Sequence, residues 1–265
     1  MVKTSLTRRL ANFAYNFSYN SVSDFVIKQV KRCLLDYLGV TLAGYETPLG
    51  KTIVNYVKNI GGCREATLIG DGCQVPCSNA AFANATLGHI LELDDGHRYA
   101  RGHPGVTSIP AVLSIAEKED SHGKDVVTAI ILGYEIFARI AKAINPSHLL
   151  RGFHTTGTCG TFGAAIAAGK VLDLNEKELT NALGIAGTQA SGLMEVFWGE
   201  SRIKPLQAGK AAQSGVLAAI LAKEGITAPD TILEGEKGFI RATSDSYNLE
   251  QIVKGLNQDF EIMNT

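Results

Sequence analysis

The run from Leu91 to Pro104 concentrates the side chains that acid-base chemistry needs. It holds three carboxylates, two histidines and two arginines, namely Glu92, Asp94, Asp95, His97, His103, Arg98 and Arg101. Imidazoles and carboxylates transfer protons, and guanidinium groups bind anions. The plain alternative is a solvated loop between two helices, whose charges would contribute little. A structural turn needs none of these groups, so we expect the run to form part of an active site.

A second segment, Gly152 to Gly160, has the composition of a helix start. Threonine hydroxyls and free backbone N–H groups at such a start can receive an anion, and His154 would stand beside that anion. Ordinary helix capping by Thr155 or Thr156 explains the threonines equally well, but it does not explain the histidine. The local sequence leaves both interpretations open.

A third segment runs from Ser201 to Ala212 and places Lys204 immediately before Pro205. Proline suits the first turn of a helix, so a helix is predicted to begin here. A lysine at this end opposes the helix dipole, which makes a purely stabilising role less natural than binding a carboxylate. We therefore predict that Lys204 is a functional residue.

The elements that must position these segments are helical. A Ser21-Val22-Ser23-Asp24 sequence resembles a capping box and precedes apolar residues at three- and four-residue spacings, which predicts a helix ending at Gly44. Further helices are predicted over 50–60, 78–88, 109–120, 124–143, 156–172, 176–191 and 205–223. A short apolar run bounded by glycines over 66–72 predicts a small hairpin. The predicted fold class is all-α, a compact multi-helix bundle with a small β-hairpin.

Composition limits the classes of partner. The 265 residues are 45% hydrophobic and 19% charged, with a formal net charge of -1, so no broad basic field exists for nucleic acid or an anionic membrane surface. The start, Met1 to Leu10, lacks the apolar run of a signal peptide, and no later segment is apolar for long enough to span a bilayer. We expect a cytoplasmic protein with no nucleic-acid or membrane partner.

The five cysteines are an odd number in a chain without an export signal, so reduced thiols are expected. Cys63, Cys73 and Cys77, with His89 nearby, suggest a metal site. However, they lack the close C-x2-C spacing that places two thiolates on one zinc ion or iron-sulfur cluster. We expect neither a metal nor another cofactor.

Taken together, the motifs resemble the MmgE/PrpD family. They are Leu93-Asp94-Asp95 followed by His103-Pro104, the run from Gly152 to Gly157, and the run from Lys204 to Ala212. That family includes 2-methylcitrate dehydratase, cis-aconitate decarboxylase and iminodisuccinate epimerase. The resemblance runs from near residue 5 to the last residue. It implies a helical domain, a homodimer and a metal-independent site for small di- or tricarboxylic acids.

The resemblance also implies roles for individual residues. By position, His103 and His154 match the family's active-site histidines, Asp94 and Asp95 its acidic pair, and Lys204 its substrate-binding lysine. The chemistry common to the family is proton removal from carbon next to a carboxyl or imino group. A neutral imidazole suits that task, and His103 is our first candidate for the base.

The loop departs from the family pattern in ways that bear on specificity. Arg98 and Arg101 lie in a loop one residue longer than that of the decarboxylase, and with Thr155 they complete our predicted substrate-binding set. Two added guanidinium groups suit a substrate with several carboxylates. Glu92 and Gly96 stand where the decarboxylase has aspartate and threonine, which argues against cis-aconitate decarboxylation.

We divide the chain into a helical domain over residues 1–242 and the start of a lid-like domain over residues 243–265. The predicted protein is a metal-independent lyase or isomerase acting on a small di- or tricarboxylic acid, weakly active or inactive without the lid. Its expected partners are the polycarboxylate, a separate lid polypeptide and a second copy of the chain, packed through small-residue helix faces such as that of 205–223. The alternative is a non-catalytic dimeric helical remnant, or an anion-binding subunit of a split enzyme.

Overall fold

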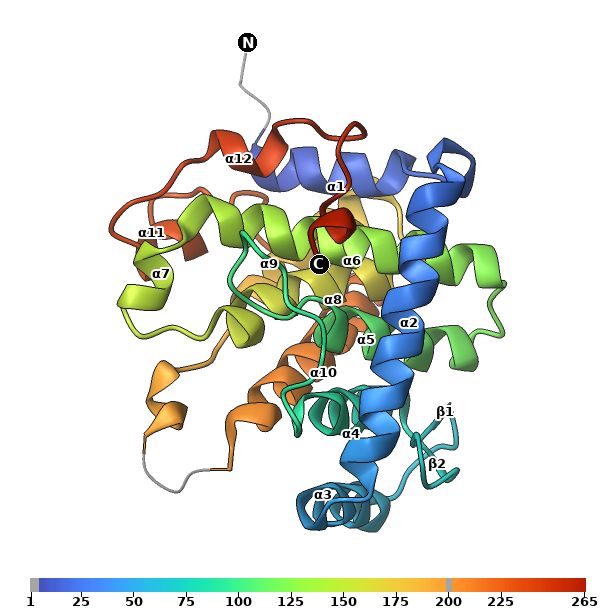
Figure 1. Ribbon diagram of the computed structural model, residues 1–265. Helices are drawn as coiled ribbons and strands as arrows, with labels where there is room; N and C mark the ends of the chain where they lie inside the picture. Colours follow the sequence, from blue (N-terminus) through green and yellow to red (C-terminus); the bar gives the residue numbers. More distant parts are fainter. Residues whose placement is uncertain (1–4, 199–201) are drawn as a thin grey trace.

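Helices make up most of the described structure, a computed structural model that covers residues 5–198 and 202–265 (Figure 1). Residues 1–4 and Ser201, where the third motif segment starts, lie outside the described residues. The α-helices are α1 (Leu6–Asn16), α2 (Asp24–Tyr45), α3 (Pro48–Ile60), α4 (Cys77–His89), α5 (Gly105–Lys118), α6 (Gly123–Ile144), α7 (Ser147–Leu150), α8 (Thr155–Val171), α9 (Glu176–Gly187), α10 (Lys204–Lys223), α11 (Phe239–Thr243) and α12 (Glu250–Val253). The 3-10 turns are η1 (Tyr19–Ser21), η2 (Met194–Phe197) and η3 (Glu261–Asn264), and strands β1 (Ala66–Thr67) and β2 (Gln74–Val75) form a hairpin. The predicted all-α class is confirmed, and no described helix is both long and apolar enough to cross a membrane.

Helix α8 is the centre of the fold, and every residue from Thr155 to Gly169 is buried. It packs against α5, α6, α9 and α10. Glycines permit the closest approaches, because a Cβ at Gly215 of α10 would lie 2.4 Å from the Cβ of Ala164 in α8. On another face of α10, a Cβ at Gly209 would lie 2.1 Å from the hydroxyl oxygen of Thr86 in α4. These small-residue faces of α10 therefore pack inside the domain, and they are not available to a second copy as the sequence had suggested.

Helix α2 begins where a serine caps it. Ser23 is the N-cap, and its hydroxyl oxygen accepts a hydrogen bond from the backbone N–H of Val26 at 3.4 Å. The hydroxyl of Ser21 instead donates to the carbonyl of Ser18 in the preceding 3-10 turn. The predicted capping box is thus placed two residues too early, although the predicted helix itself is confirmed.

The predicted hairpin is also confirmed, with its second strand beyond the predicted residues. Ala66 pairs with Val75 and Thr67 with Gln74 in an antiparallel register. The turn between the strands includes Gly70, whose φ of 91° is the left-handed backbone that glycine adopts most readily. Strand β1 packs against α4 and α5, so the hairpin is attached to the helices that flank the predicted active-site loop.

The C-terminal residues pack back onto the helices. Helix α12 contacts α1 and α6, and the turn η3 contacts α2 and α6. Ile262 is completely buried within η3. In Figure 1 the chain end lies in front of α6, beside α2. Residues 243–265, predicted to start a lid, therefore lie along the helical domain in this structure.

Candidate active site

Three histidines from three segments lie close together, and two of them contact one carboxylate. His89 is the last residue of α4, His103 lies just before α5, and His154 is the N-cap of α8. The ring centroids of His89 and His103 are 4.8 Å apart, and those of His89 and His154 are 6.2 Å apart. We call His89, Asp94, His103 and His154 the histidine cluster. The structure thus brings together residues that the sequence places in separate motifs.

Asp94 connects two of the imidazoles. Both of its carboxylate oxygens lie 2.9 Å from Nδ1 of His89, and Oδ2 lies 3.2 Å from Nδ1 of His103. Its side chain is only 2% exposed. Burial alone would raise the pKa of Asp94, but the hydrogen bonds from His103 and His89 outweigh burial and hold that pKa well below its ordinary value. Asp94 is therefore an anion shared by His89 and His103.

The surroundings of His103 fix its tautomer. Nδ1 faces the Asp94 carboxylate and lies 2.9 Å from the backbone carbonyl oxygen of Asp95. Both neighbours accept hydrogen bonds, so Nδ1 carries the proton. Burial alone would lower the pKa of His103, but the hydrogen bond and charge of Asp94 raise it above the ordinary value. Nε2 has no hydrogen-bond partner among the described residues on this 26% exposed side chain, so it is the atom that can exchange a proton.

His154 has the opposite environment. The Gln207 side chain donates through Nε2 to the carbonyl of Leu193 at 3.0 Å, which leaves its Oε1 to accept from Nδ1 of His154 at 2.7 Å. Burial lowers the pKa of His154 to about 4, although the hydrogen bond with Gln207 opposes this change. His154 is therefore neutral at pH 7. Two neighbouring imidazoles with pKa values moved in opposite directions are typical of acid-base sites.

Asp95 points toward the helices. Its Oδ1 accepts from the backbone N–H of Gly105 at 3.1 Å, at the start of α5, and its Oδ2 accepts from the hydroxyl of Tyr134 in α6. Burial raises the pKa of Asp95 to about 6, with the Tyr134 hydrogen bond opposing the rise and the charge of Asp94 adding to it. The two members of the acidic pair are thus divided: Asp94 contacts the histidines, and the Asp95 side chain closes the loop onto α5 and α6.

Lys204 stands at the first position of α10 and is paired with a carboxylate. Its Nζ lies 2.6 Å from Oε2 of Glu92 and 4.9 Å from the ring centroid of Phe197. The lysine charge opposes protonation of both His103 and His154. The predicted helix start at Lys204-Pro205 is confirmed. The ammonium group of Lys204 acts electrostatically on His103 and His154.

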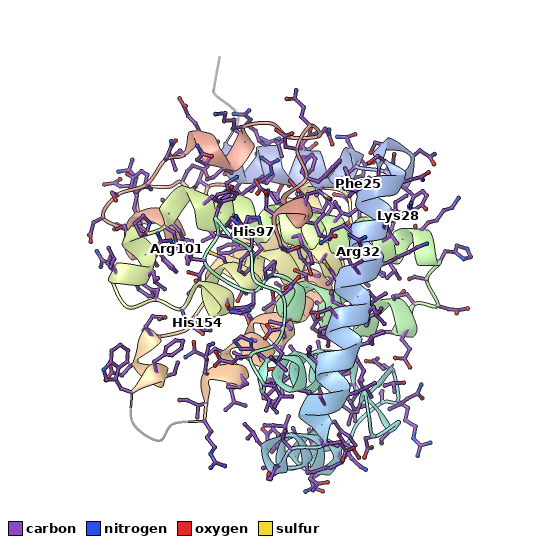
Figure 2. The ribbon with its side chains drawn as sticks, viewed as in Figure 1. Phe25, Lys28, Arg32, His97, Arg101 and His154 are labelled. Carbon is purple, nitrogen blue, oxygen red and sulfur yellow. The ribbon has the colours of Figure 1, made fainter. Side chains whose placement is uncertain are left out.

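The two predicted arginines lie outside this cluster. Arg98 and Arg101 are exposed, and neither guanidinium forms a hydrogen bond or ion pair with another residue that the structure describes. Figure 2 labels Arg101 and His97 on the loop and His154 near the start of α8. The charges of Arg98 and Arg101 remain available for an anion that reaches the loop.

The threonines of the second motif have different contacts from those predicted. Thr155 is fully buried, and its hydroxyl oxygen accepts from the side-chain amide of Asn145 at 3.3 Å. The hydroxyl that contacts the cluster belongs to Thr156, which accepts from the backbone N–H of His103 at 3.2 Å. Neither threonine caps α8, because the N-cap is His154, so capping by a threonine, one of the two interpretations that the sequence left open, is wrong.

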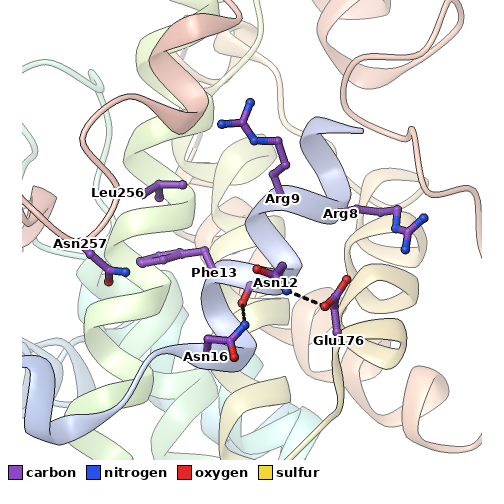
Figure 3. Close-up of a pocket in the computed structure, with 8 residues that line it drawn as sticks. All are labelled: Arg8, Arg9, Asn12, Phe13, Asn16, Glu176, Leu256 and Asn257. Carbon is purple, nitrogen blue, oxygen red and sulfur yellow. Dashed lines mark hydrogen bonds between the residues drawn. The ribbon is translucent and has the colours of Figure 1, made fainter. Parts of the chain in front are cut away.

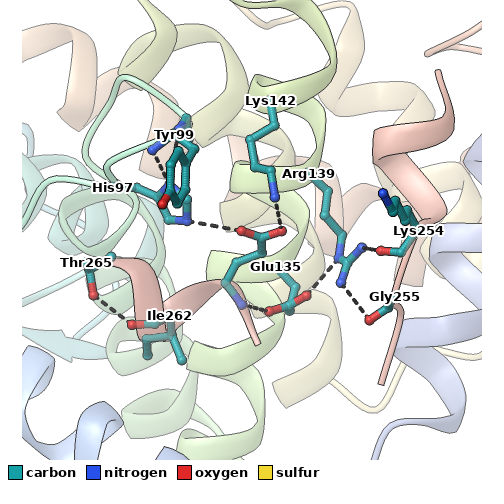
Figure 4. Close-up of polar contacts among 11 residues, drawn as sticks. His97, Tyr99, Glu135, Arg139, Lys142, Lys254, Gly255, Ile262 and Thr265 are labelled. Atoms are coloured by element: carbon teal, nitrogen blue, oxygen red, sulfur yellow. Dashed lines mark hydrogen bonds and ion pairs between the residues drawn. The ribbon is translucent and has the colours of Figure 1, made fainter. Parts of the chain in front are cut away.

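A buried ion-pair network joins the loop to the C-terminal segment (Figure 4). Nδ1 of His97 accepts from the backbone N–H of Ala100 at 3.0 Å, so its Nε2 carries the proton and lies 3.2 Å from Oε2 of Glu261. Lys142 donates to the other oxygen of Glu261 at 2.7 Å. Burial alone would raise the pKa of Glu261, but its contacts with His97 and Lys142 lower it to about 2. These contacts hold the loop that carries Asp94 and His103.

Comparison with known proteins identifies the domain that carries this site. Residues 8–252 match the sequence model of the MmgE/PrpD N-terminal domain. The chain belongs to the MmgE/PrpD family. It is 33% identical to the cis-aconitate decarboxylase of Aspergillus terreus over 270 residues, which are 96% of this chain and 54% of that protein. It is 30% identical to the cis-aconitate decarboxylase of Homo sapiens over 245 residues, 90% of this chain and 50% of that protein. The chain thus spans about half the length of these curated relatives.

One group of described residues in this MmgE/PrpD domain has the spacing of a metal site. The candidate ligand atoms of His89, Asp94 and His103 lie within 4.8 Å of one another. Cys63, Cys73 and Cys77 belong to no such group within the described residues. The contacts of Asp94 have hydrogen-bond lengths of 2.9 and 3.2 Å, and each of these imidazoles meets it with the same nitrogen, Nδ1. Hydrogen bonding is therefore sufficient to explain the arrangement.

The site of this MmgE/PrpD domain includes residues for which the sequence predicts no part in it, within the histidine cluster and next to it. His89 had been considered only as a metal ligand with the cysteines, and Tyr134 and Thr156 had no predicted function in proton chemistry. The only local signal for His89 is its position at a helix end, immediately before the acidic loop. Tyr134 lies in the middle of the apolar helix α6, so only its contact with Asp95 reveals its part in the site.

A separate surface cavity of about 630 Å³ lies beside α1 (Figure 3). Arg8, Arg9 and Glu176 contribute charged side chains to its lining. The Glu176 carboxylate already accepts a hydrogen bond from the side-chain amide of Asn12 at 2.6 Å. The cavity contains no histidine and shares no residue with the histidine cluster. The imidazole groups that could transfer protons therefore lie at the histidine cluster and not in this cavity.

Proposed function

We propose that this MmgE/PrpD domain serves a lyase or isomerase reaction on a small di- or tricarboxylic acid. A proton moves from carbon next to a carboxyl or imino group. The observation that carries the proposal is the Asp94 carboxylate shared by His89 and His103, which raises the pKa of His103 and contacts its Nδ1, while Nε2 has no partner among the residues that the structure describes. The names of the fungal and human relatives support a small tricarboxylate as substrate.

The proposed steps follow from the hydrogen-bond partners of each group. Nε2 of His103 removes the proton from the substrate carbon, and Asp94 stabilises the imidazolium that forms. Lys204 binds a substrate carboxylate and offsets the negative charge that develops in the enolate-like transition state. Neutral His154 accepts a hydrogen bond at Nε2 and thereby orients the substrate. The exposed guanidinium groups of Arg98 and Arg101 supply further contacts for carboxylates.

Two observations bear on which bond of the substrate breaks, and they favour different reactions. The names of the curated relatives favour decarboxylation of a tricarboxylate. Glu92 and Gly96 depart from the loop residues of those enzymes and favour dehydration or epimerisation. All three reactions transfer a proton at carbon next to a carboxylate. In dehydration and epimerisation His103 removes that proton, whereas in decarboxylation CO2 leaves, its bonding electrons stay on carbon, and protonated His103 delivers a proton to that carbon.

Three further properties belong to the proposal. The reaction is metal-independent, since an imidazole base and a lysine suffice for proton removal and charge stabilisation. The working protein is a homodimer in the cytoplasm. Its site is completed by a lid that corresponds to the part of the curated relatives beyond the region they share with this chain, which is about half of their length. Turnover that is unchanged after treatment with a chelator, in protein shown by elemental analysis to contain no metal, would support metal independence. Loss of turnover on chelation would contradict it.

The proposal is tested by incubating the chain with 2-methylcitrate, cis-aconitate and iminodisuccinate in D2O and following each acid by proton NMR. Each sample is repeated with a second polypeptide that spans the remaining half of the Aspergillus terreus relative. Deuterium incorporation, elimination or loss of CO2 in either sample supports the proposal. Binding without any of these reactions would support the anion-binding subunit instead. Absence of both binding and reaction would contradict a polycarboxylate site.

A further inference from the structure

The ammonium group of Lys204 already holds a carboxylate that belongs to the chain. Oε2 of Glu92 lies 2.6 Å from Nζ of Lys204, within the range of a strong charge-assisted hydrogen bond. We propose that Glu92 is an internal substitute for a substrate carboxylate, which fills the Lys204 subsite until a polycarboxylate displaces it. This inference rests on the proposed function, because it assumes that Lys204 binds an anion there.

The two partners differ in how freely they can leave the pair. The Lys204 side chain is 10% exposed, whereas that of Glu92 is 49% exposed. Glu92 can therefore turn into solvent while the lysine stays in place. Ion pairs with such exposure contribute little net stability, so exchange of one carboxylate for another has a small cost. The pair is suited to displacement.

The backbone at Glu92 is also unusual. Its φ of 53° lies in the left-handed region, which residues with a Cβ adopt uncommonly. Its backbone N–H donates to the carbonyl of His89 at 3.4 Å, directly after α4. This turn therefore connects His89 of the histidine cluster to Glu92, whose carboxylate contacts Lys204. The internal carboxylate and the cluster are parts of one loop.

Phe197 places the Glu92–Lys204 pair next to the chemistry. The centroid of the Phe197 ring lies 4.9 Å from Nζ of Lys204. It lies 6.3 Å from the centroid of the His154 ring, and these two rings meet edge to face. A carboxylate bound at Lys204 therefore lies close to the histidine cluster, because Phe197 is a neighbour of both Lys204 and His154. A substrate with several carboxylates can displace Glu92 because its other carboxylates gain contacts with the histidines and the loop arginines. A monocarboxylate has no such compensation, so the pair selects polycarboxylates.

The test is calorimetric titration with tricarballylate, a saturated tricarboxylate, and with acetate. Glu92→Gln removes the competing charge and should bind tricarballylate about three- to tenfold more tightly than the wild type. Acetate binding should improve by at least as large a factor. The matched control is Glu46→Gln, which removes the carboxylate of another lysine pair, with Lys51 at 3.2 Å, and should change neither affinity.

The dependence on Lys204 completes the test. Adding Glu92→Gln to Lys204→Met should give no gain, because the subsite is gone. Tricarballylate binding to the wild type with equal or weaker binding to both Glu92→Gln and Glu92→Ala would overturn the inference while leaving the proposed function intact. Absence of tricarballylate binding in the wild type and both Glu92 variants would overturn the anion site itself, and the inference with it.

Discussion

Asp94→Asn removes one negative charge from the histidine cluster with little change in shape. The carboxylate accepts from His89 and His103, whereas an amide oxygen can replace one of these acceptors and the amide NH2 would face a donor. A hydrogen bond to a charged group contributes about 1.5–3 kcal/mol and a neutral one about 1 kcal/mol. Losing one bond and weakening the other should lower the free energy of unfolding by about 2–5 kcal/mol. The pKa of His103 should fall, because the anion that stabilises its imidazolium is gone.

Two measurements test this reasoning about Asp94. Urea unfolding followed by circular dichroism gives the stability change, and proton–nitrogen NMR of the imidazoles gives the titration of His103. Asp71→Asn is the matched control, because Asp71 pairs with Lys58 at 3.0 Å and contacts no histidine. It should cost less than about 1 kcal/mol and leave His103 unchanged. A folded Asp94→Asn variant in which His103 titrates as in the wild type would refute the shared-anion account.

Three other outcomes are expected from the same geometry. Lys204→Met should weaken tricarballylate binding about 10- to 100-fold through loss of a charge-assisted contact, and equal affinities in calorimetry would exclude Lys204 from the subsite. Glu261→Gln should destabilise the fold by up to about 3 kcal/mol at pH 7; because the pKa of Glu261 is lowered to about 2, this difference should shrink as pH falls from about 4.5 toward 2, and a difference independent of pH would contradict the network. Burial lowers the pKa of His148 to about 4, so its stabilising contribution is full above about 6.5 and is lost as pH falls toward 4. Urea midpoints should therefore show His148→Gln gaining stability relative to the wild type between pH 7 and pH 4, and a constant gap would contradict neutral burial of this histidine.

The sequence predicts most of the helices because their apolar residues recur at helical spacing. Helix α1 carries the same signal and was nevertheless missed: Ser5 caps it, and Leu6, Leu10 and Phe13 share its buried side or border it. Polar residues between them, such as Thr7, Arg8 and Arg9, make the pattern harder to read in so short a helix. The short helices near the C-terminus have too few turns for periodicity, and they are stabilised by contacts with α1 and α6.

The chemical types of the site residues are readable from sequence, but their contacts are not. Asp94 and Asp95 are neighbours with similar intrinsic pKa values, and only the fold turns one toward the histidines and the other toward Tyr134. The opposite pKa changes of His103 and His154 arise from burial and from partners that no local pattern contains. The same holds for the C-terminal network, whose members are far apart in sequence. Tertiary structure supplies the electrostatics that composition cannot.

The central claim is that His103 transfers the substrate proton, and deuterium exchange tests it most directly. The polycarboxylate from the D2O screen that shows the fastest exchange is incubated with the wild type, with His103→Gln, and with His122→Gln as an exposed-histidine control. Circular dichroism verifies that all three are folded. The account predicts exchange in the wild type and the control and a loss of about 100-fold or more in His103→Gln, the usual scale of general-base catalysis. Exchange at the wild-type rate in folded His103→Gln would contradict it.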